Sequence, residues 1–245
     1  MANPLILNII IIVIIVAIVN LLCFGFKKYI FKLVNNKNDN PWIIKDTKNA
    51  KNSMIITQDP KDENSITLYR SDGLNGELQF SYSFWMCIEN MEYNFGKWKH
   101  VFHKGNKTTF PNRAPGIFIH KDTNALRFYM NTYKNMLEYV DIDNIPIRRW
   151  FHVALVLEGQ HLDIYFNGYL KKRHKLTSMA KQNFGDLYLN MYGGYEGYLS
   201  RLRYYRHALN YREIESIVNE GPSKDSCSGT DEKPPYLNDD WWSQK

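Results

Sequence analysis

A short run of basic residues is the part of the sequence best suited to binding an anion. The run is followed later in the chain by two arginines, and together they comprise Lys171, Lys172, Arg173, Lys175, Arg201 and Arg203. If the strands that carry them are neighbours, these cations share one surface that could bind a sulfated or acidic glycan, phosphate groups or an acidic protein. Alternatively, consecutive charges lie on a solvated edge strand, where they guard against edge-to-edge aggregation.

Two tyrosines in the stretch "MYGGYEGY" are the second candidate for ligand contact. Tyr192 and Tyr195 are flanked by glycines, and rings on such a loop suit stacking against a sugar or contact with a protein. The same stretch could equally be a strand connection packed by its own rings. The sequence therefore proposes a binding site made of basic residues and tyrosines, with both structural alternatives open.

Acidic residues in the pattern required for glycoside hydrolysis are absent. That reaction needs two carboxylates facing one cleft, about 5–5.5 Å apart for retention or about 6.5–9.5 Å apart for inversion. The nearest group is Glu138, Asp141 and Asp143, in which only the two aspartates share a strand face. Glu213 and Glu215 fall on a predicted helix as solvated charges. We therefore predict no catalytic residue and a protein that is not an enzyme.

The cysteines suggest neither nucleophilic catalysis nor a metal site. Cys87 lies within a predicted strand beside Trp85, and the chain has no G-x-S-x-G motif and no Cys₂His₂ cluster. Three cysteines do not make a disulfide framework. Only Cys87 and Cys227 could pair, since Cys23 lies in an apolar run, and we expect free thiols. The sequence predicts no metal ligands and no cofactor.

The elements that would position these residues are mostly strands. The chain has 245 residues, of which 44% are hydrophobic and 15% aromatic, enough for one domain with attachments. Its net charge of +6 is a mild excess and does not indicate a nucleic-acid partner. Between residues 53 and 222, a dozen short alternating runs, residues 65–71 among them, are separated by Gly, Asn, Asp and Pro. This pattern predicts an all-β sandwich or barrel.

Two of these runs give more detailed predictions. Residues 150–158 are apolar on both faces, which indicates a central strand covered on both sides, and we expect His152 in it to be a hydrogen-bonded structural residue. Residues 161–168 alternate and end in Asn167-Gly168, which predicts a tight type I′ hairpin.

One short helix is predicted near the C-terminal end. Asn210 is a good N-cap, Glu213 completes a capping box, and Gly221 followed by proline ends the helix. The remaining residues 223–245 are read as a polar C-terminal tail that could dock on the domain or contact a partner.

The N-terminal residues 1–26 are predicted to be a membrane anchor. Residues 5–26 contain no charge and, as a helix, would span roughly 33 Å, which matches a bilayer core of about 30 Å. A cleaved signal peptide would need a basic start and a small-residue cleavage site, and neither is present. Lys27, Lys28 and Lys32 follow the span and predict a cytosolic C-terminal side. Residues 27–52 are read as a linker.

The order of the predicted elements resembles the laminin-G-like, concanavalin A-like family of jelly-roll sandwiches. Four stretches carry the likeness, and they are "SITLYRSDG" (65–73), "FSYSFWMCI" (80–88), "RRWFHVALVLEGQHLDIYFNGYL" (148–170) and "GYEGYLSRLRYYRHALNYREIESIVNEG" (194–221). The resemblance implies two antiparallel sheets of six or seven strands in residues 53–222. It also makes calcium the ion to consider, with Asp122, Asp141, Asp143 and Asp186 as loop-side candidates, although no motif marks them.

These observations lead to two functional expectations. The first is a non-enzymatic, membrane-anchored recognition or scaffold protein, similar to virion proteins of large DNA viruses and acting as a minor structural component beside a capsid or an internal membrane. Its partners would be the lipid bilayer and capsid or other membrane proteins, with the sandwich facing the cytosol. The alternative is a cell-surface, lectin-like adhesin that binds acidic glycans.

Overall fold

The computed structural model describes residues 18–27, 40–71 and 77–224, which belong to two compact units, residues 1–39 and residues 40–245. In the first unit residues 18–27 are helical. Within the residues described, no helix combines the length and the apolar character needed to cross a membrane. Most of the predicted anchor, residues 5–17, lies outside the described residues, as does the tail from residue 225 onward, and the membrane span stays a prediction.

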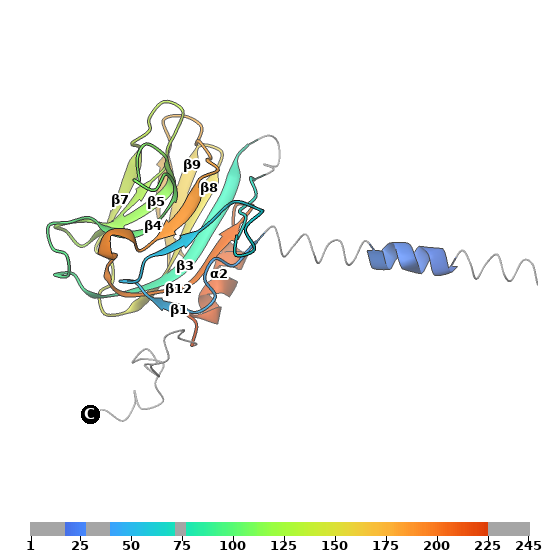
Figure 1. Cartoon of the computed structure of the whole chain (residues 1–245), viewed down its shortest axis with the longest axis horizontal. Helices are drawn as coiled ribbons and strands as arrows, with labels where there is room; N and C mark the ends of the chain where they lie inside the picture. The colour runs from blue at the N-terminus through green and yellow to red at the C-terminus, as the bar shows by residue number, and fades with distance from the viewer. Residues whose placement is uncertain (1–17, 28–39, 72–76, 225–245) are drawn as a thin grey trace, which may run out of the picture. The chain divides into compact units, whose positions relative to one another are not determined.

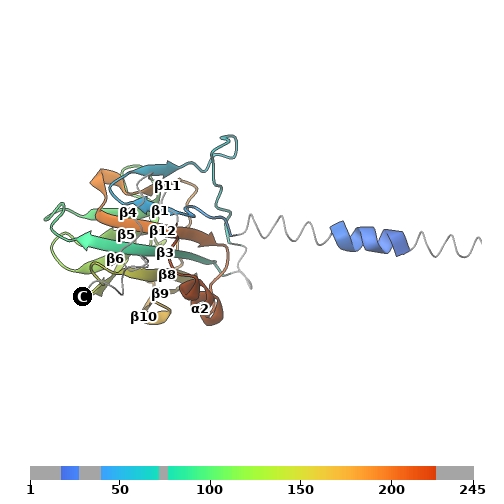
Figure 2. The same ribbon diagram turned by 90° about the horizontal axis from the view of Figure 1, so that it is seen from below.

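The second unit is a sandwich of two antiparallel sheets, each with six strands among the described residues (Figures 1 and 2). Sheet A has the order β1-β12-β3-β8-β9-β10 and sheet B the order β2-β11-β4-β5-β6-β7. The strands of sheet A are β1 (Thr47–Asn49), β3 (Gln79–Asn90), β8 (Trp150–Glu158), β9 (His161–Phe166), β10 (Tyr169–Lys175) and β12 (Glu196–Tyr205). Those of sheet B are β2 (Met54–Ile56), β4 (Lys99–Gly105), β5 (Arg113–Ile119), β6 (Ala125–Tyr129), β7 (Tyr139–Asp143) and β11 (Asp186–Leu189). The predicted all-β, two-sheet architecture is confirmed.

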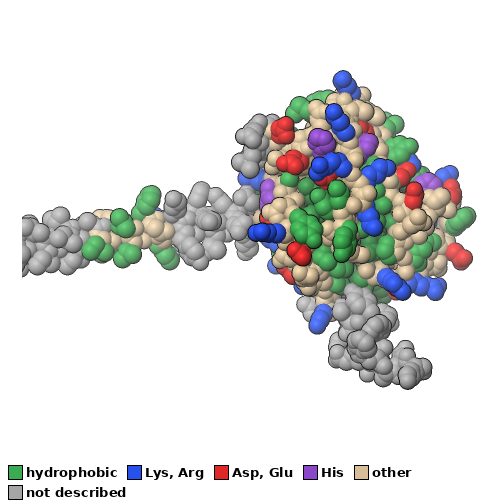
Figure 3. Space-filling view, turned by 180° about the vertical axis from the view of Figure 1, so that it is seen from behind, with side chains coloured by type: hydrophobic (Ala, Val, Ile, Leu, Met, Phe, Trp, Pro, Cys, Tyr) green, Lys and Arg blue, Asp and Glu red, His purple; other side chains and the backbone are tan. Residues whose placement is uncertain are grey.

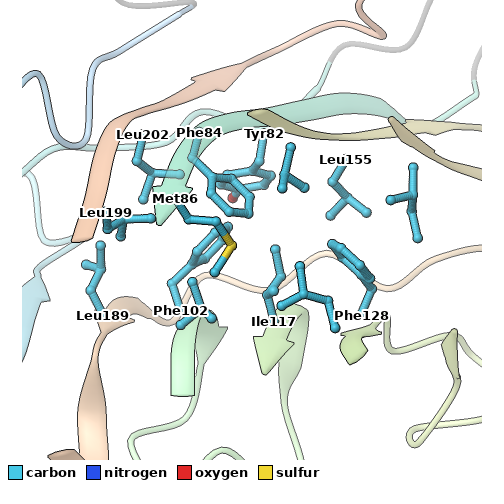
Figure 4. Close-up of a cluster of buried hydrophobic side chains, with 14 of the residues drawn as sticks. Tyr82, Phe84, Met86, Phe102, Ile117, Phe128, Leu155, Leu189, Leu199 and Leu202 are labelled. Atoms are coloured by element: carbon cyan, nitrogen blue, oxygen red, sulfur yellow. The ribbon is translucent and has the colours of Figure 1, made fainter. Parts of the chain in front are cut away.

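The core lies between the sheets because alternate residues of each strand point inward. On β3 the inward residues include Tyr82, Phe84 and Met86, and they meet Phe102 and Phe128 from sheet B (Figure 4). Each of these side chains is almost completely buried, and burial of a large apolar side chain contributes about 1.5–3 kcal/mol. This shared core holds the two sheets face to face.

The central strand and the hairpin form as predicted. β8 pairs with β3 on one side and β9 on the other, and His152 on it is 0% exposed, with its Nε2 2.8 Å from Ser83 Oγ. The turn between β9 and β10 has φ of 49° at Asn167 and 86° at Gly168, the left-handed values that a type I′ turn requires.

One helix, α2 (Tyr211–Glu220), packs on the outer face of sheet A. Its N-terminus has the predicted capping box, since Asn210 Oδ1 accepts from Glu213 N at 3.0 Å and Glu213 Oε2 accepts from Asn210 N at 2.9 Å. Ile214 is completely buried and packs in one cluster with Val156 of β8 and Tyr205 of β12. A short 3₁₀ turn, η2 (Met191–Gly193), precedes β12.

Two details of the predicted organisation are wrong. Residues 40–52 belong to the sandwich rather than to a linker, because Ile43 and Ile44 lie in the core and their backbone N–H groups donate to Leu202 O. Residues 65–71 form no strand. There the side chain of Gln58 replaces a partner strand, since it donates to Ile66 O and accepts from Leu68 N.

Both ends of the described sandwich lie beside β12. Near the start, Asn40 O accepts a hydrogen bond from Arg203 Nε, and β1 pairs with β12 through Thr47 and Ser200. Near the end, Ser223 N donates to Ser200 Oγ and Ser223 O accepts from Thr47 Oγ1. The same strand therefore anchors the first and the last residues of the fold.

Candidate functional site

The structure does not bring the predicted basic residues together. β10, which carries Lys171, Lys172, Arg173 and Lys175, is an edge strand of sheet A, and β3, β8 and β9 separate it from β12 with Arg201 and Arg203. Four strand spacings of about 4.8 Å place the two groups roughly 19 Å apart. The premise that their strands are neighbours is therefore wrong, and the edge-strand alternative describes the position of β10.

The arginines of this set are also engaged within the fold. Arg173 donates to both carboxylate oxygens of Asp163, at 2.8 and 2.6 Å. Arg201 pairs with Glu220 at 3.1 Å, and the guanidinium of Arg203 lies 4.6 Å from the ring centre of Trp42. The three lysines are exposed along β10, and a ligand-binding role for the whole set stays a prediction.

The two candidate tyrosines differ in accessibility. Tyr195 is 0% exposed and its hydroxyl donates to Tyr198 O at 2.8 Å, so its ring is not available to a sugar. Tyr192 is 61% exposed, and its hydroxyl donates to Lys107 O at 2.9 Å. Of the pair, only Tyr192 presents a ring to a ligand.

Three of the acidic residues considered for catalysis or calcium, Glu138, Asp141 and Asp186, accept hydrogen bonds within the fold. Buried Glu138 accepts from Thr177 N at 2.8 Å, from Thr177 Oγ1 at 2.7 Å and from Thr132 Oγ1 at 3.1 Å. Burial alone would raise the pKa of Glu138, but these hydrogen bonds and one with His174 outweigh burial and lower the pKa. Within the described ranges, no group of three or more His, Cys, Asp or Glu side chains is placed to hold a metal ion.

The outer face of sheet B carries a concentration of rings that the sequence reading missed. Cross-strand pairs align two rows over this sheet, one formed by Tyr188, His103, Gly116, Tyr129 and Tyr139, the next by His100, Phe118, Arg127 and Asp141. We call this surface the aromatic face and define it by Trp98, His100, His103, Arg113, Phe118, Arg127, Tyr129, Tyr139 and Tyr188. Its accessible members are Trp98, Arg113, Arg127, Tyr129 and Tyr139, whereas the other four rings are buried beneath the surface. A period-two reading of β6 could have found part of it, because Arg127 and Tyr129 alternate with the core residues Leu126 and Phe128.

The guanidinium groups of two arginines lie over rings of the aromatic face. The guanidinium carbon of Arg127 is 3.8 Å from the ring centre of Tyr139 and 4.7 Å from that of Trp98. Its Nε and Nη2 donate to the two oxygens of Asp141, both at 2.7 Å, and these bonds raise the pKa of Arg127. The guanidinium carbon of Arg113 is 3.6 Å from the ring centre of Tyr129. Such cation–π pairs contribute about 0.5–2 kcal/mol each and fix the rings in place.

A chain of two histidines joins this face to the loops at its border. Met191 N donates to His100 Nδ1 at 3.0 Å, His100 Nε2 lies 2.7 Å from His103 Nδ1, and His103 Nε2 lies 2.8 Å from Asn106 O. Because the first acceptor is fixed as Nδ1 of His100, both rings must be neutral with the proton on Nε2. Burial lowers the pKa of both histidines, which agrees with this assignment.

On one face of the molecule, charge is not separated into a single patch. Figure 3 shows one face of the molecule on which basic and acidic side chains are interspersed among apolar ones. The arrangement suits a ligand held by rings and a few directed hydrogen bonds better than a polyanion held by long-range charge.

Comparisons with known proteins agree with this fold. The profile of the Concanavalin A-like lectin/glucanases superfamily matches residues 59–215, well over half of the chain. No curated protein matches the chain significantly. The binding domain of botulinum neurotoxin serotype D has a TM-score of 0.52 at 14% identity, over 75% of this chain and 51% of that one.

Two further solved structures have lower TM-scores. The binding domain of botulinum neurotoxin DC in complex with rat synaptotagmin II has a TM-score of 0.47 at 18% identity, over 60% of this chain and 37% of that one. The same domain in complex with SialylT has a TM-score of 0.46 at 18% identity, over 58% and 35%. This chain thus spans between about a third and about half of these solved chains, and at such identities the likeness concerns the fold alone. On the strength of the profile match and the two six-stranded sheets, the chain belongs to the Concanavalin A-like lectin/glucanases superfamily.

Proposed function

We propose that this protein is a non-catalytic recognition protein that binds carbohydrate through its aromatic face. The observation that carries the proposal is the part of the aromatic face where the rings of Trp98, Tyr129 and Tyr139 lie beside the guanidinium groups of Arg113 and Arg127. Aromatic rings give a sugar an apolar surface, and arginine supplies directed N–H donors for its oxygens.

The placement of these residues supports binding without reorganisation. Arg113, Arg127, Tyr129 and Tyr139 all lie on paired strands of one sheet, and side chains on strands are held more rigidly than those on loops. Tyr139 remains 48% exposed. A ligand would therefore meet a preformed surface, which lowers the entropic cost of binding.

The state of the carboxylates supports recognition over catalysis. Glu138 is saturated with hydrogen bonds, and Asp141 is paired with both arms of Arg127. A general acid in a glycosidase needs a raised pKa and access to the glycosidic oxygen. Glu138 has a lowered pKa and is buried, so it fits neither requirement.

Glycan binding by the full-length chain tests the proposal. We expect Tyr139→Ala to weaken binding about 2- to 10-fold, the loss that corresponds to one aromatic contact of about 0.5–1.5 kcal/mol. Tyr169→Ala is the matched control, because Tyr169 is 72% exposed but lies on β10 of the other sheet. Equal effects of the two substitutions, or no binding to any glycan on a broad array, would refute the proposal.

The setting in which the protein acts is a separate matter. The alternative expected from the sequence, a lectin-like adhesin, is the one closest to this proposal. The membrane-anchored virion role has no support from the family match or from the solved structures, and it stays a prediction with the cytosol-facing orientation. Protease protection of the membrane-bound full-length chain would test that orientation.

A further inference from the structure

We propose that Arg113 makes the aromatic face selective for carbohydrate that carries a carboxylate group. The proposal rests on the carbohydrate-binding function given above and specifies the chemical class of the sugar.

Arg113 has no acidic partner among the described residues, unlike Arg127, Arg173 and Arg201. Arg127 pairs with Asp141, Arg173 with Asp163, and Arg201 with Glu220. Burial is the largest cause that lowers the pKa of Arg113, the like-charged Arg127 lowers it further, and Tyr129, which hydrogen-bonds to the guanidinium, opposes both. A partly desolvated guanidinium without a counter-charge is costly, and an anion that binds there offsets the cost.

A glycine makes room for the side chain of Arg113. Gly116 occupies the position in the first row between His103 and Tyr129. A Cβ at residue 116 would lie 3.3 Å from Arg113 Cβ, 3.5 Å from Arg113 Cδ and 3.5 Å from His103 Cβ. The arginine therefore lies over the one position of the row that has no side chain, and its guanidinium reaches the ring of Tyr129.

Besides a hydrogen bond with Tyr129, no side-chain hydrogen bond to the Arg113 guanidinium occurs among the described residues, so most of its N–H groups remain as donors for a ligand. The backbone N of Arg113 donates to Asn131 Oδ1 at 2.5 Å, which fixes the base of the side chain. Its Nε is buried and has no hydrogen-bond partner, and Tyr129 covers one face of the guanidinium. A carboxylate can accept two parallel N–H bonds from a guanidinium, a geometry that a hydroxyl or an ester cannot reproduce.

The neighbouring ring provides the apolar part of such a site. The centre of the Tyr139 ring lies 5.8 Å from that of Tyr129, so an exposed aromatic surface adjoins the arginine. An acidic sugar would contact Tyr139 with its ring while its carboxylate bonds to Arg113. A neutral sugar would make the first contact only.

The test uses the full-length chain on an array of matched pairs, each an acidic glycan beside its methyl ester. We expect the best acid to bind at least about 10-fold more tightly than its ester, a difference typical of a charged hydrogen-bonded pair. Arg113→Gln should lower the affinity for the acidic glycan to that for its ester and leave the affinity for the ester unchanged. Arg173→Gln, which removes a paired arginine from the other sheet, should preserve the preference.

A second variant guards against a folding defect in the first. Gly116→Ala keeps the charge of Arg113 but crowds its Cβ and Cδ, so we expect a partial loss of the acid preference with binding to the ester retained. Acid and ester that bind equally, with binding still dependent on Tyr139, would overturn this inference and leave the proposed function intact. Absence of binding to every pair would overturn both, and tighter, Arg113-dependent binding of a sulfated glycan would overturn the carboxylate assignment.

Discussion

His100 Nε2 and His103 Nδ1 lie 2.7 Å apart on the outer face of sheet B, in a chain that runs from Met191 N to Asn106 O. The chain links η2 to the loop that follows β4, and it holds only while both imidazoles are neutral. Protonation of either ring would place two N–H donors against each other.

The first prediction concerns stability at low pH. Burial lowers the pKa of His100, His103 and His152, the last to about 3, whereas the unfolded value is about 6.5. A lowered histidine pKa means that the unfolded state binds more protons, so the contribution is complete above about pH 6.5 and is lost as pH falls. We expect the free energy of unfolding in urea to decrease between about pH 6.5 and pH 5, by up to about 1.4 kcal/mol per pH unit for each histidine.

His100→Gln tests the origin of that slope. The glutamine Oε1 can accept from Met191 N and its Nε2 can donate to His103, so the chain survives with one titrating group fewer. The pH slope should be shallower than in the parent chain, while His161→Gln, a change at the exposed start of β9, should leave it as it was. If the parent chain and both variants showed the same dependence of unfolding free energy on pH, His100 would not be a source of that dependence.

The second prediction concerns Glu138, which bridges the segments after β6 and β10. Glu138→Gln keeps the volume but turns one acceptor into a donor facing Thr177 or Thr132. We expect a loss of about 1–3 kcal/mol in the free energy of unfolding, as for a buried group left unsatisfied. Glu215→Gln on the exposed side of α2 should change it by less than about 0.5 kcal/mol, and an equal effect of both would show that the buried bonds contribute little.

The third prediction compares two glycines with positive φ. Gly197 has φ of 148° and a Cβ there would lie 1.9 Å from Cys87 O, whereas Gly96 has φ of 75° with nothing within 4 Å. Gly197→Ala should therefore lower the free energy of unfolding by more than about 3 kcal/mol or prevent folding, because β3 and β12 would be forced apart. Gly96→Ala should cost only the conformational strain of about 1–2 kcal/mol. Thermal unfolding of the two variants side by side checks the order.

The fourth prediction concerns the reactivity of Cys87. Burial, and to a lesser degree the charge of Glu89, raises the pKa of this thiol to about 12. Since the thiolate is the reactive form, we expect no alkylation of Cys87 in the native protein at about pH 8 and complete alkylation in denaturant. Peptide mapping by mass spectrometry distinguishes it from exposed Cys23, which should react in both states. A disulfide between Cys87 and Cys227 in the same map would reveal an oxidising compartment.

The fifth prediction concerns membrane orientation. Asn106 is exposed and begins the sequon Asn106-Lys107-Thr108. If the sandwich faces the cytosol, as the lysines after the apolar stretch predict, Asn106 should carry no glycan in a eukaryotic host. A mobility shift on glycosidase treatment, absent in Asn106→Gln, would reverse the predicted orientation and favour a surface adhesin.

Local features of the fold were predictable from the sequence, whereas the assembly of the site was not. β8, β9 and α2 were found because the apolar pattern of a strand and the capping residues of a helix lie close together in the sequence. β1 has three residues and no alternation, and its pairing with β12 depends on a contact more than a hundred residues away. The separation of β10 from β12 has the same cause, since strand order is set by long-range pairing.

The aromatic face was missed for a related reason. Apart from Trp98, which precedes β4, its residues come from β4, β5, β6, β7 and β11, and each strand contributes only one or two of them. The relation between Gly116 and Arg113 is visible only once the register of β4, β5 and β6 is known, because that register places Gly116 between His103 and Tyr129. Reading the outward residues of every strand together, instead of searching for clustered charges, would have recovered most of the rows.

The anchoring of both ends of the sandwich on β12 has a consequence for engineering. Asn40 contacts Arg203, and Ser223 contacts Ser200, so the two ends lie roughly 10 Å apart along one strand. A linker of a few residues could join these two ends. New termini opened at the exposed turn around Gly96 would then give a circular permutant of the sandwich. Because its two ends lie close together, the sandwich is suited to insertion as a domain into a surface loop of another protein.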